Sequence, residues 1–470
     1  MKRFTYLLFL LSVFAFGQNN PKLETFKMYS QNVKDSIDVK VWLPFDYDKT
    51  SEKYPVLFEC VYDHTNFLAA TFANIWNSPK TIVVFANIEA GNEHYSSPQL
   101  TEKGQQYYAF IKDELFQNLK KKYRTSDYKI ATGLSQGGDY LGYILRNNPN
   151  LFNSYLFFST ERPIFYKPDF KSYSAKIEQP ISVFIATSSD AEERIKFANE
   201  LNDSLKINPK INIKKEHYPN SEHSYSILYA FPDALNFAYK DYVEYLERKT
   251  GETLVDFYNY CIREKREKYG NLNYNQLIFR LSSKINKNDS EKDLSELLDI
   301  VSKDEQSFDI DFFNLGYNIY QFEFYTIAEK AYQIALQKAE TKENRMDKSS
   351  IYRYLSRVYD KQNNKEKALS TLQNAYEKLK TKDEDLLFDI GKYYIDSKIN
   401  PKKGIETLNS LITEKHKTRF PRSKDQIFTE IAKGYFALNN KKSGLQYLEK
   451  ALEFNANFEE ALKLKGKLGK

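Results

Sequence analysis

The sequence predicts an α/β domain with a doubly wound, mostly parallel sheet, followed by an all-α domain of helical repeats. Between residues 18 and 245, apolar β-rich runs alternate with helical patterns, which favours such a sheet. From about residue 255 onward, patterns rich in Lys, Glu, Leu and Tyr indicate helices and repeat one spacing of small and large residues. With 470 residues, 41% of them hydrophobic, the chain is long enough for two or three packed domains.

The first 17 residues have the layout of a secretory signal peptide. Lys2 and Arg3 precede an apolar run over residues 4–16, and small residues stand just before Gln18. This run is shorter than the roughly 20 residues that a membrane-spanning helix needs, although an uncleaved N-terminal anchor is the alternative. We therefore expect export to the periplasm or the cell exterior, with no membrane span after cleavage.

The composition argues against two classes of ligand. The formal charge of +6 is spread over many lysines and acids, so nucleic acid is not an expected partner. No cluster of cysteines and histidines has the spacing of metal ligands, and we predict no metal and no other cofactor. Cys60 lies in a strand-like run and Cys261 in a helical one, so we expect two buried thiols rather than a disulfide.

Seven apolar, β-rich runs are predicted to form the sheet, with helical stretches between them at 106–123 and 191–205. The predicted strands cover residues 37–43, 56–61, 81–88, 128–132, 155–159, 181–186 and 211–218. In a doubly wound sheet, functional loops gather at the carboxyl ends of the strands. The residues that follow these runs are therefore the candidates for chemistry.

The fourth predicted strand runs into a Gly-x-Ser-x-Gly pattern, Gly133-Leu-Ser-Gln-Gly137, and a helical pattern follows directly. A serine between a strand and a helix must turn sharply and expose its hydroxyl, and the glycines let the two backbones pass closely. We therefore interpret Ser135 as a nucleophile, with the N–H of Gln136 at the helix N-terminus as an oxyanion donor. The alternative is an ordinary turn between a strand and a helix.

A serine nucleophile needs a base that takes its proton and an acid that orients the base. Of the five histidines, only His217 and His223 follow Ser135 before residue 245. His217 falls inside the last predicted strand and is interpreted as structural, whereas His223 lies in the loop beyond it and is the candidate base. Asp190, in the loop after the sixth predicted strand, is the favoured acid. Glu192 is the alternative, although it can belong to the first turn of the next helix.

The C-terminal part repeats itself four times. Small and large residues recur at offsets 0, 1, 4, 13, 17 and 20 from Leu315, Leu355 and Ile431, and a copy from Ile390 fits with one inserted residue. Small residues at these offsets let two antiparallel helices interlock, and the units should stack into a superhelix. The pattern resembles tetratricopeptide repeats over 306–470, preceded by a helical linker at 246–305, and an undifferentiated helical bundle is the alternative. Such repeats usually dock peptides or proteins, so we expect a partner of that kind.

The first domain resembles the esterase family that includes enterochelin esterase-like and esterase D-like enzymes. The likeness rests on Tyr54-Pro-Val-Leu-Phe58, Phe110-Ile-Lys-Asp-Glu-Leu-Phe116 with Lys122-Tyr-Arg-Thr125, Gly133-Leu-Ser-Gln-Gly-Gly138, Asn148-Pro-Asn-Leu-Phe-Asn153 and Tyr218-Pro-Asn-Ser-Glu-His223. The resemblance implies an α/β-hydrolase fold over residues 18–245, hydrolysis of a carboxylic ester, and a triad of Ser135, Asp190 and His223. Secreted members with tetratricopeptide-like tails are similar over nearly the whole chain.

Two stretches depart from the family pattern. Members often carry Leu-Asp-Gly in the loop that supplies the second oxyanion donor, whereas this chain has Cys60-Val-Tyr-Asp-His-Thr-Asn-Phe67, with one extra residue and no glycine. The second donor is then expected from the backbone N–H of Tyr62 or Asp63. The family's usual Ser-Pro-Ser is replaced by Ser159-Thr160-Glu161-Arg162 at the end of the strand predicted at 155–159, which implies an altered acyl or alcohol pocket.

These residues predict an exported serine esterase that acts on a small-molecule or conjugated ester through an acyl-enzyme. The alternative is a catalytically weak hydrolase-fold protein that binds or assembles with partners through its helical repeats. The altered oxyanion loop and the long repeat array motivate that alternative. A peptidase of the same fold is a further one.

Overall fold

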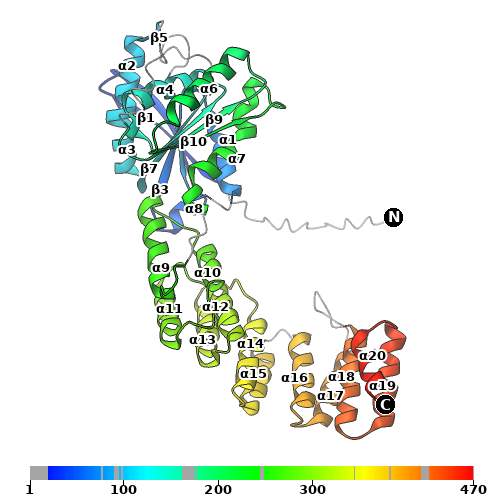
Figure 1. The fold of residues 1–470 in the computed structure, drawn as a ribbon. Coiled ribbons are helices and arrows are strands. Elements are labelled where there is room, and N and C mark those ends of the chain that lie inside the picture. The colour runs from blue at the N-terminus through cyan, green and yellow to red at the C-terminus, as the bar shows by residue number, and fades with distance from the viewer. Residues whose placement is uncertain are drawn as a thin grey trace, which may run out of the picture. The chain divides into compact units, whose positions relative to one another are not determined.

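The computed structural model describes residues 20–75, 78–88, 95–96, 99–160, 174, 177–243, 248–342, 344–379, 383–413 and 423–468. The predicted signal peptide at 1–17 lies outside these residues. The chain divides into two compact units (Figure 1). One comprises Met1–Glu247 with Cys261–Leu272, and the other comprises Arg248–Tyr260 with Asn273–Lys470.

The first unit is built on an eight-stranded sheet with the strand order β1-β2-β4-β3-β7-β8-β9-β10. Its strands are β1 (Lys22–Ser30), β2 (Asp35–Leu43), β4 (Ile82–Ala86), β3 (Tyr54–Glu59), β7 (Thr125–Leu134), β8 (Ser154–Phe158), β9 (Ile181–Thr187) and β10 (Ile211–His217). β1 and β2 pair antiparallel, as do β2 and β4, whereas the six strands from β4 to β10 run parallel. The carboxyl ends of these six strands therefore meet at one edge of the sheet.

Helices cover both faces of this sheet (Figure 1). On one face, Phe158 of β8 contacts Phe231, and Phe184 of β9 contacts Phe237. The helices of this face are α1 (Thr65–Asn74) and α7 (Ser226–Ala238), followed by the short α8 (Lys240–Val243). The helices of the other face are α2 (Glu102–Ala109), α3 (Phe116–Lys122), α4 (Gln136–Asn147) and α6 (Glu192–Leu205), with the π-helical segment Phe110–Leu115 between α2 and α3. Smaller elements are the 3₁₀ turns Tyr47–Lys49, Pro149–Leu151 and His223–Tyr225 and the strands β5 (Tyr95–Ser96) and β6 (Gln99–Leu100).

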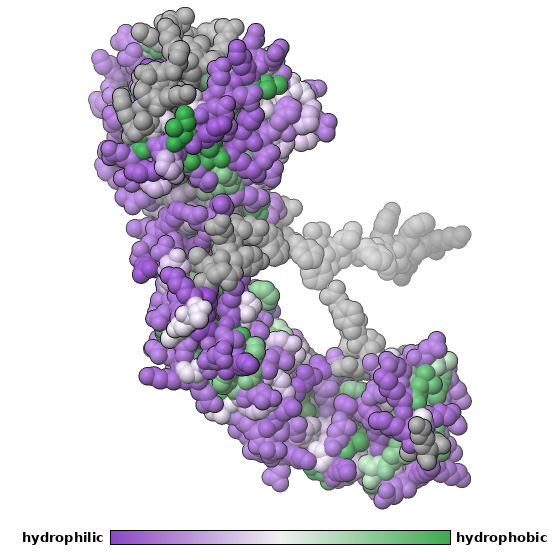
Figure 2. Space-filling view, viewed as in Figure 1, coloured by the Kyte–Doolittle hydropathy of each residue, from purple (hydrophilic) through white to green (hydrophobic). Residues whose placement is uncertain are grey.

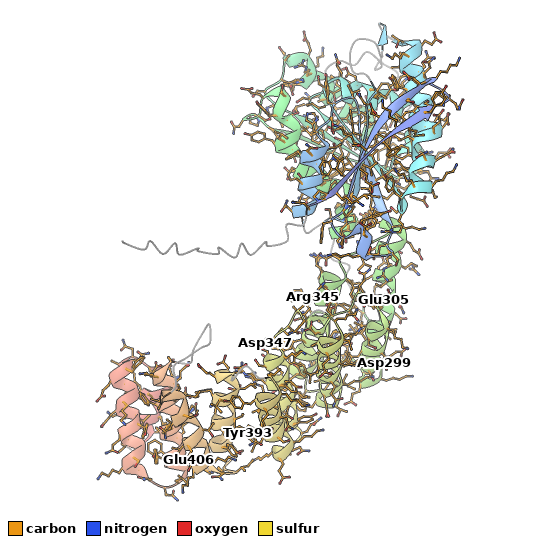
Figure 3. The ribbon with its side chains drawn as sticks, turned by 180° about the vertical axis from the view of Figure 1, so that it is seen from behind. Asp299, Glu305, Arg345, Asp347, Tyr393 and Glu406 are labelled. Atoms are coloured by element: carbon orange, nitrogen blue, oxygen red, sulfur yellow. The ribbon has the colours of Figure 1, made fainter. Side chains whose placement is uncertain are left out.

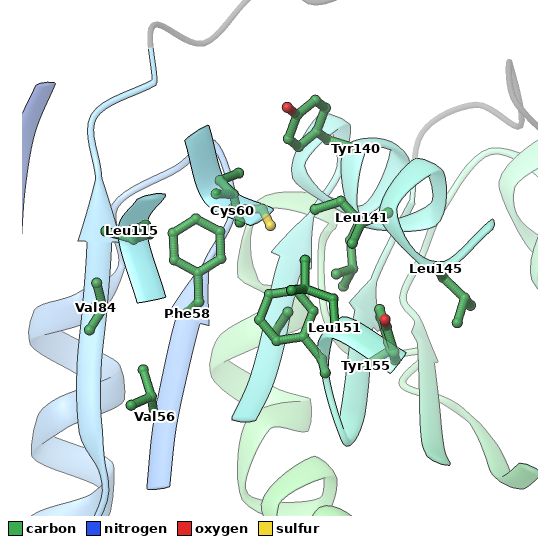
Figure 4. Close-up of a cluster of buried hydrophobic side chains, with 14 of the residues drawn as sticks. Val56, Phe58, Cys60, Val84, Leu115, Tyr140, Leu141, Leu145, Leu151 and Tyr155 are labelled. Carbon is green, nitrogen blue, oxygen red and sulfur yellow. The ribbon is translucent and has the colours of Figure 1, made fainter. Parts of the chain in front are cut away.

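Burial on both faces explains the sequence pattern of the central strands. Every residue of β3, β4 and β8 is buried, so these strands are continuous apolar runs rather than alternating ones. Within β8, Tyr155 and Phe157 join the cluster beneath α4, and Phe158 faces α7. Figure 4 shows part of the apolar cluster beneath α4, with Cys60 beside Leu141 of α4. This packing seats α4 against the ends of the strands that carry the site.

The predicted fold class is confirmed, and all seven predicted strands are present with ends displaced by at most three residues. The helix predicted at 191–205 is α6, and the one predicted at 106–123 consists of the end of α2, the π-helical segment and α3. The strand β1 was not predicted. Exposed residues alternate with half-buried ones over most of its length, because it is an edge strand with one face in solvent.

The second unit consists of helices that pair along the chain. It includes α10 (Tyr274–Ser282), α11 (Glu291–Lys303), α12 (Asp309–Gln321), α13 (Tyr325–Thr341), α14 (Lys348–Lys361), α15 (Lys365–Lys378), α16 (Glu384–Asp396), α17 (Pro401–Thr413), α18 (Lys424–Ala437), α19 (Lys441–Phe454) and α20 (Glu459–Leu468). The helix α9 (Leu254–Ile262) crosses the boundary between the units and continues into the π-helical segment Arg263–Glu267. The pairs α12–α13, α14–α15, α16–α17 and α18–α19 coincide with the four copies of the sequence pattern.

Each of these four pairs turns through a residue with positive φ at the same place in the repeat. The residue lies eight positions after the first residue of each copy, in the turn between the two helices. These residues are Glu323, Asn363, Lys398 and Asn439, with φ between 58° and 68°. The left-handed conformation ends the first helix in each pair.

Small residues let the paired helices interlock. A Cβ on Gly316 would lie 3.0 Å from the Tyr332 ring, and a Cβ on Gly391 would lie 2.7 Å from Leu408. Polar contacts then join successive pairs at a separation close to one repeat. The Tyr393 hydroxyl donates to Asp360 (2.7 Å; Tyr393 is labelled in Figure 3).

The visible surface of both units is largely hydrophilic (Figure 2). Within the described residues, no helix has the length and apolar character of a membrane span. Cys60 and Cys261 are both buried and form no disulfide within the described chain, as predicted.

Candidate active site

Ser135 stands at the turn between β7 and α4, with φ of +53° and ψ of −119°. A positive φ is uncommon for a residue with a Cβ, and strained residues of this kind cluster at functional sites. The Ser135 N–H donates to the carbonyl of Phe158 (3.0 Å), and the Ser135 carbonyl accepts from the N–H of Asp139 (3.2 Å). The backbone on both sides therefore holds the turn in place.

The glycines of the elbow are required by close backbone contacts. A Cβ on Gly133 would overlap the carbonyl oxygen of Gly137, and a Cβ on Gly137 would overlap the carbonyl oxygen of Cys60. β7, α4 and the loop after β3 therefore meet at this point because neither glycine has a side chain. Gln136 is the first residue of α4, where backbone N–H groups have no acceptor within the helix.

The loops after β9 and β10 bring Asp190 and His223 together. Nδ1 of His223 lies 2.8 Å from Oδ1 of Asp190. The two loops follow parallel neighbouring strands and are joined by a hydrogen bond from the N–H of Ser189 to the carbonyl of Ser221 (2.8 Å). With Nδ1 occupied by the carboxylate, Nε2 is the ring nitrogen that can take a proton from a reacting group. This is the arrangement of an oriented general base.

Three donors fix the Asp190 carboxylate, whose side chain is fully buried. Oδ1 faces His223, and Oδ2 accepts from the Ser159 hydroxyl (2.7 Å) and from the N–H of Ser188 (2.7 Å). Burial raises the pKa of Asp190, but the hydrogen bonds from His223, Ser188 and Ser159 outweigh it and hold the pKa well below its ordinary value. The Asp190 carboxylate is therefore ionised at any pH at which a neutral imidazole could act as a base.

Hydrogen bonds across neighbouring strand ends link this pair to the elbow. Ser135 bonds through its N–H to the end of β8, and Ser159, just beyond β8, bonds through its N–H to Ala186 of β9 (2.9 Å). Neighbouring strands lie about 4.8 Å apart. Through its bond to Ser159, Asp190 therefore contacts the end of β8, and β8 is the neighbour of β7, the strand that ends just before Ser135.

The loop after β3 rests against the elbow. Val61 has a φ of +72°, and the N–H of Tyr62 donates to the carbonyl of Cys60 (2.9 Å), which closes a γ-turn. The Tyr62 hydroxyl lies 3.4 Å from Oε1 of Gln136. Of the two predicted second donors, Tyr62 thus directs its N–H to its own loop. The N–H of Asp63 has no acceptor among the described residues.

A pocket of about 710 Å³ opens beside this loop. Its wall includes Val61, Tyr62 and Asp63 from the loop, together with side chains of β1, β2 and β4. Lys40 from β2 forms an ion pair with Asp63 (2.5 Å) on this wall. The pocket is large enough for part of a small organic substrate.

The other predicted residues lie apart from this cluster. Glu192 is exposed in the first turn of α6. His217 ends β10, where its Nδ1 lies 3.0 Å from the Thr187 hydroxyl. Glu161 and Arg162, from the altered family stretch, fall outside the described residues.

Sequence reasoning missed two groups at the site. Ser159 was treated only as part of an altered stretch, although its hydroxyl holds Asp190. Glu59 and His64 were given no role, yet they bond across the loop after β3. One signal was present: Glu59 is a charged residue inside an otherwise apolar strand, and a carboxylate is buried there only with a partner.

Comparison with known proteins bears on the first unit. Residues 30–207 match the family described as "Putative esterase". This match supports an esterase domain over the strands that carry the elbow and Asp190. No curated protein matches the chain.

Solved structures with a similar arrangement share little sequence with the chain. An uncharacterised protein from Capnocytophaga ochracea is 15% identical with a TM-score of 0.45, and the match covers 76% of this chain and 94% of that one. An IroE-like serine hydrolase from Shewanella oneidensis is 15% identical with a TM-score of 0.41, covering 67% and 99%. The feruloyl esterase module from Clostridium thermocellum is 16% identical with a TM-score of 0.39, covering 49% and 92%.

Proposed function

We propose that the protein is an exported serine esterase that hydrolyses a carboxylic ester through an acyl-enzyme. The observation that carries the proposal is the hydrogen bond between Asp190 and His223, on loops that follow β9 and β10 at the same edge of the sheet as the Ser135 elbow. The family match over residues 30–207 supports the same activity. The signal-peptide pattern of the first 17 residues supports export.

In the first half of the reaction, the Ser135 hydroxyl attacks the ester carbonyl and Nε2 of His223 takes its proton. The carbonyl carbon becomes tetrahedral, and its oxygen gains negative charge. Backbone N–H groups of Gln136 and of the loop after β3 bind this oxyanion. Asp190 holds the ring and stabilises the imidazolium while it carries the proton. The imidazolium then protonates the departing alkoxide, and the alcohol leaves.

In the second half, water replaces the alcohol. His223 takes a proton from the water as it attacks the acyl-Ser135 carbonyl, and a second tetrahedral intermediate forms at the same donors. Its collapse breaks the bond to Ser135 Oγ, which recovers its proton from His223. The products are a carboxylic acid and an alcohol, and the enzyme is unchanged.

We assign the second unit a docking role for a protein or peptide, as a tetratricopeptide-like array. The four helix pairs, the close packing at glycines in three of them and their common left-handed turn support this assignment. Such repeats expose a continuous surface built from successive units, which suits an extended partner.

The test is ester hydrolysis by purified protein on a panel of siderophore, feruloyl, sugar-acyl and thioester substrates, with Ser135→Ala as the control. At least one ester should be turned over by the wild type and not by the variant. Equal rates in the two proteins would overturn the proposal and favour a binding protein that acts through its repeats. Offering amide and ester forms of the best substrate separates an esterase from a peptidase of the same fold.

A further inference from the structure

A buried acidic residue lies beneath the loop that faces the elbow. Glu59 is the last residue of β3, and its side chain is 1% exposed. Both of its carboxylate oxygens bond to one residue. Oε2 accepts from the backbone N–H of His64 (2.7 Å), and Oε1 lies 2.6 Å from Nδ1 of the same histidine. A buried carboxylate satisfied by a single residue fixes that residue in position and orientation.

These two bonds close the loop formed by residues 60–63, between β3 and α1. The loop touches the elbow at two places: the carbonyl of Cys60 lies against Cα of Gly137, and the Tyr62 hydroxyl approaches Gln136. It also contains Val61, a β-branched residue with a φ of +72°. Such a conformation is strained and persists only where the surroundings hold it. The Glu59 carboxylate is in place to supply that restraint.

Among the backbone N–H groups of residues 60–64, one is in a position to bind an oxyanion. The N–H groups of Cys60, Tyr62 and His64 already donate within the chain. The Val61 N–H and the Cys60 carbonyl belong to one trans peptide and point in opposite directions. Because the Cys60 carbonyl faces Gly137 of the elbow, the Val61 N–H points away from the elbow. The Asp63 N–H has no acceptor in the described chain, and Asp63 is exposed. Its side chain is held separately by Lys40 and Thr65.

We propose that Glu59 and His64 are positioning residues that hold the Asp63 N–H as the second oxyanion donor, in place of the glycine loop of the esterase family. This inference rests on the proposed esterase function. Neither side chain touches the substrate in this account. They act by keeping the strained loop against the elbow, so that the Asp63 N–H meets the developing oxyanion together with the N–H of Gln136.

The experiment compares variants for turnover and for binding of two inhibitors. Glu59→Gln removes an acceptor, and His64→Ala removes the ring. Each should lower kcat/KM for the best ester by about 10- to 100-fold, since loss of a whole oxyanion donor costs about 10²–10³. Affinity for a trifluoromethyl ketone, which forms the oxyanion, should fall in proportion. Affinity for the ether analogue of the ester, which has no carbonyl, should stay within about twofold of the wild type by the same argument.

Two matched variants serve as controls. His64→Asn keeps an amide N–H close to the Nδ1 position and should restore most of the activity. Asp46→Asn removes a carboxylate from the ion pair with Lys80 and should change nothing. Asp46 follows β2 near the start of β4, at the edge of the sheet opposite to Ser135.

Three results would overturn the inference. They are unchanged turnover and ketone affinity in both Glu59→Gln and His64→Ala, equal losses for ketone and ether, or no rescue by His64→Asn. If Glu59→Gln does not fold, the partly exposed His64 carries the test through its two variants, with thermal unfolding as the check. A wild type that lacks Ser135-dependent turnover contradicts the proposed function instead, so the two failures are distinguishable.

Discussion

Nδ1 of His223 lies 2.8 Å from Oδ1 of Asp190, although the two residues are 33 positions apart in the chain. The contact follows from topology, because β9 and β10 are parallel neighbours and the residues occupy the loops at their carboxyl ends. Parallel strands place such loops side by side at one edge of the sheet. Asp190 and His223 are therefore brought together by the parallel order of the strands that carry their loops.

Asp190→Asn should lower kcat about 10⁴-fold, because an amide no longer selects the tautomer that leaves Nε2 free to accept a proton. The amide at position 190 would also direct an N–H group at Ser159 or Ser188, which donate to the carboxylate in the wild type. The measurement is steady-state turnover of the best ester. Glu192→Gln is the matched control, since Glu192 is exposed on α6, and its kcat should equal that of the wild type. The opposite ranking would make Glu192 the acid.

Acid unfolding should depend on Asp190. Its pKa is held below that of the unfolded chain, so the stabilisation is complete above pH 3.8 and is lost as the pH falls through the folded-state pKa. Urea denaturation of the wild type and Asp190→Asn should show a difference in unfolding free energy that shrinks as the pH falls from about 4 to about 2. A difference that stays constant over this range would mean that Asp190 does not titrate as described.

The Glu59–His64 pair should act with the opposite sign. Burial raises the pKa of Glu59 to about 7, against the opposing hydrogen bond from His64, and that bond raises the pKa of His64. The folded pair thus keeps protons that the unfolded chain has released. Its contribution to stability is lost as the pH rises from about 4.5 through 7. Glu59→Gln should flatten this decline in urea denaturation, and an equal slope in both proteins would contradict the assignment.

The helical repeats make a prediction about packing. A Cβ on Gly404 would lie 2.6 Å from the backbone carbonyl of Gly391, so Gly404→Ala should destabilise the protein by about 1–3 kcal/mol. Gly466→Ala in α20 meets nothing within 4 Å and should stabilise it by about 0.5–1 kcal/mol. Urea unfolding followed by helical circular dichroism measures both. Equal effects would show that Gly404 does not sit in a tight helix crossing.

The parts of the fold that the sequence predicted are those with a strong local pattern. β3, β4 and β8 are buried on both faces, and the elbow needs two glycines. β1 was missed because its mixed composition suits an edge strand. The left-handed turns at Glu323 and Lys398 could not be read from residue type, since neither residue favours that conformation.

At the site, the Asp190–His223 contact could be predicted from chain order, whereas the contacts of Ser159 and Glu59 could not. Ser135, Asp190 and His223 each follow a recognisable strand. Ser159 acts through a contact with a residue 31 positions away, and no periodicity signals it. The direction of the Tyr62 N–H depends on a γ-turn at Val61, a residue type that ordinarily avoids positive φ.

The most direct test of the account is the rate at which a fluorophosphonate labels Ser135, measured by intact mass and peptide mapping. The wild type should gain one phosphonyl group, located on Ser135, and Ser135→Ala should gain none. His223→Ala should react at least about 10³-fold more slowly, because its serine lacks the base that takes the proton. Labelling of His223→Ala at the wild-type rate, or labelling at another residue, would contradict the account.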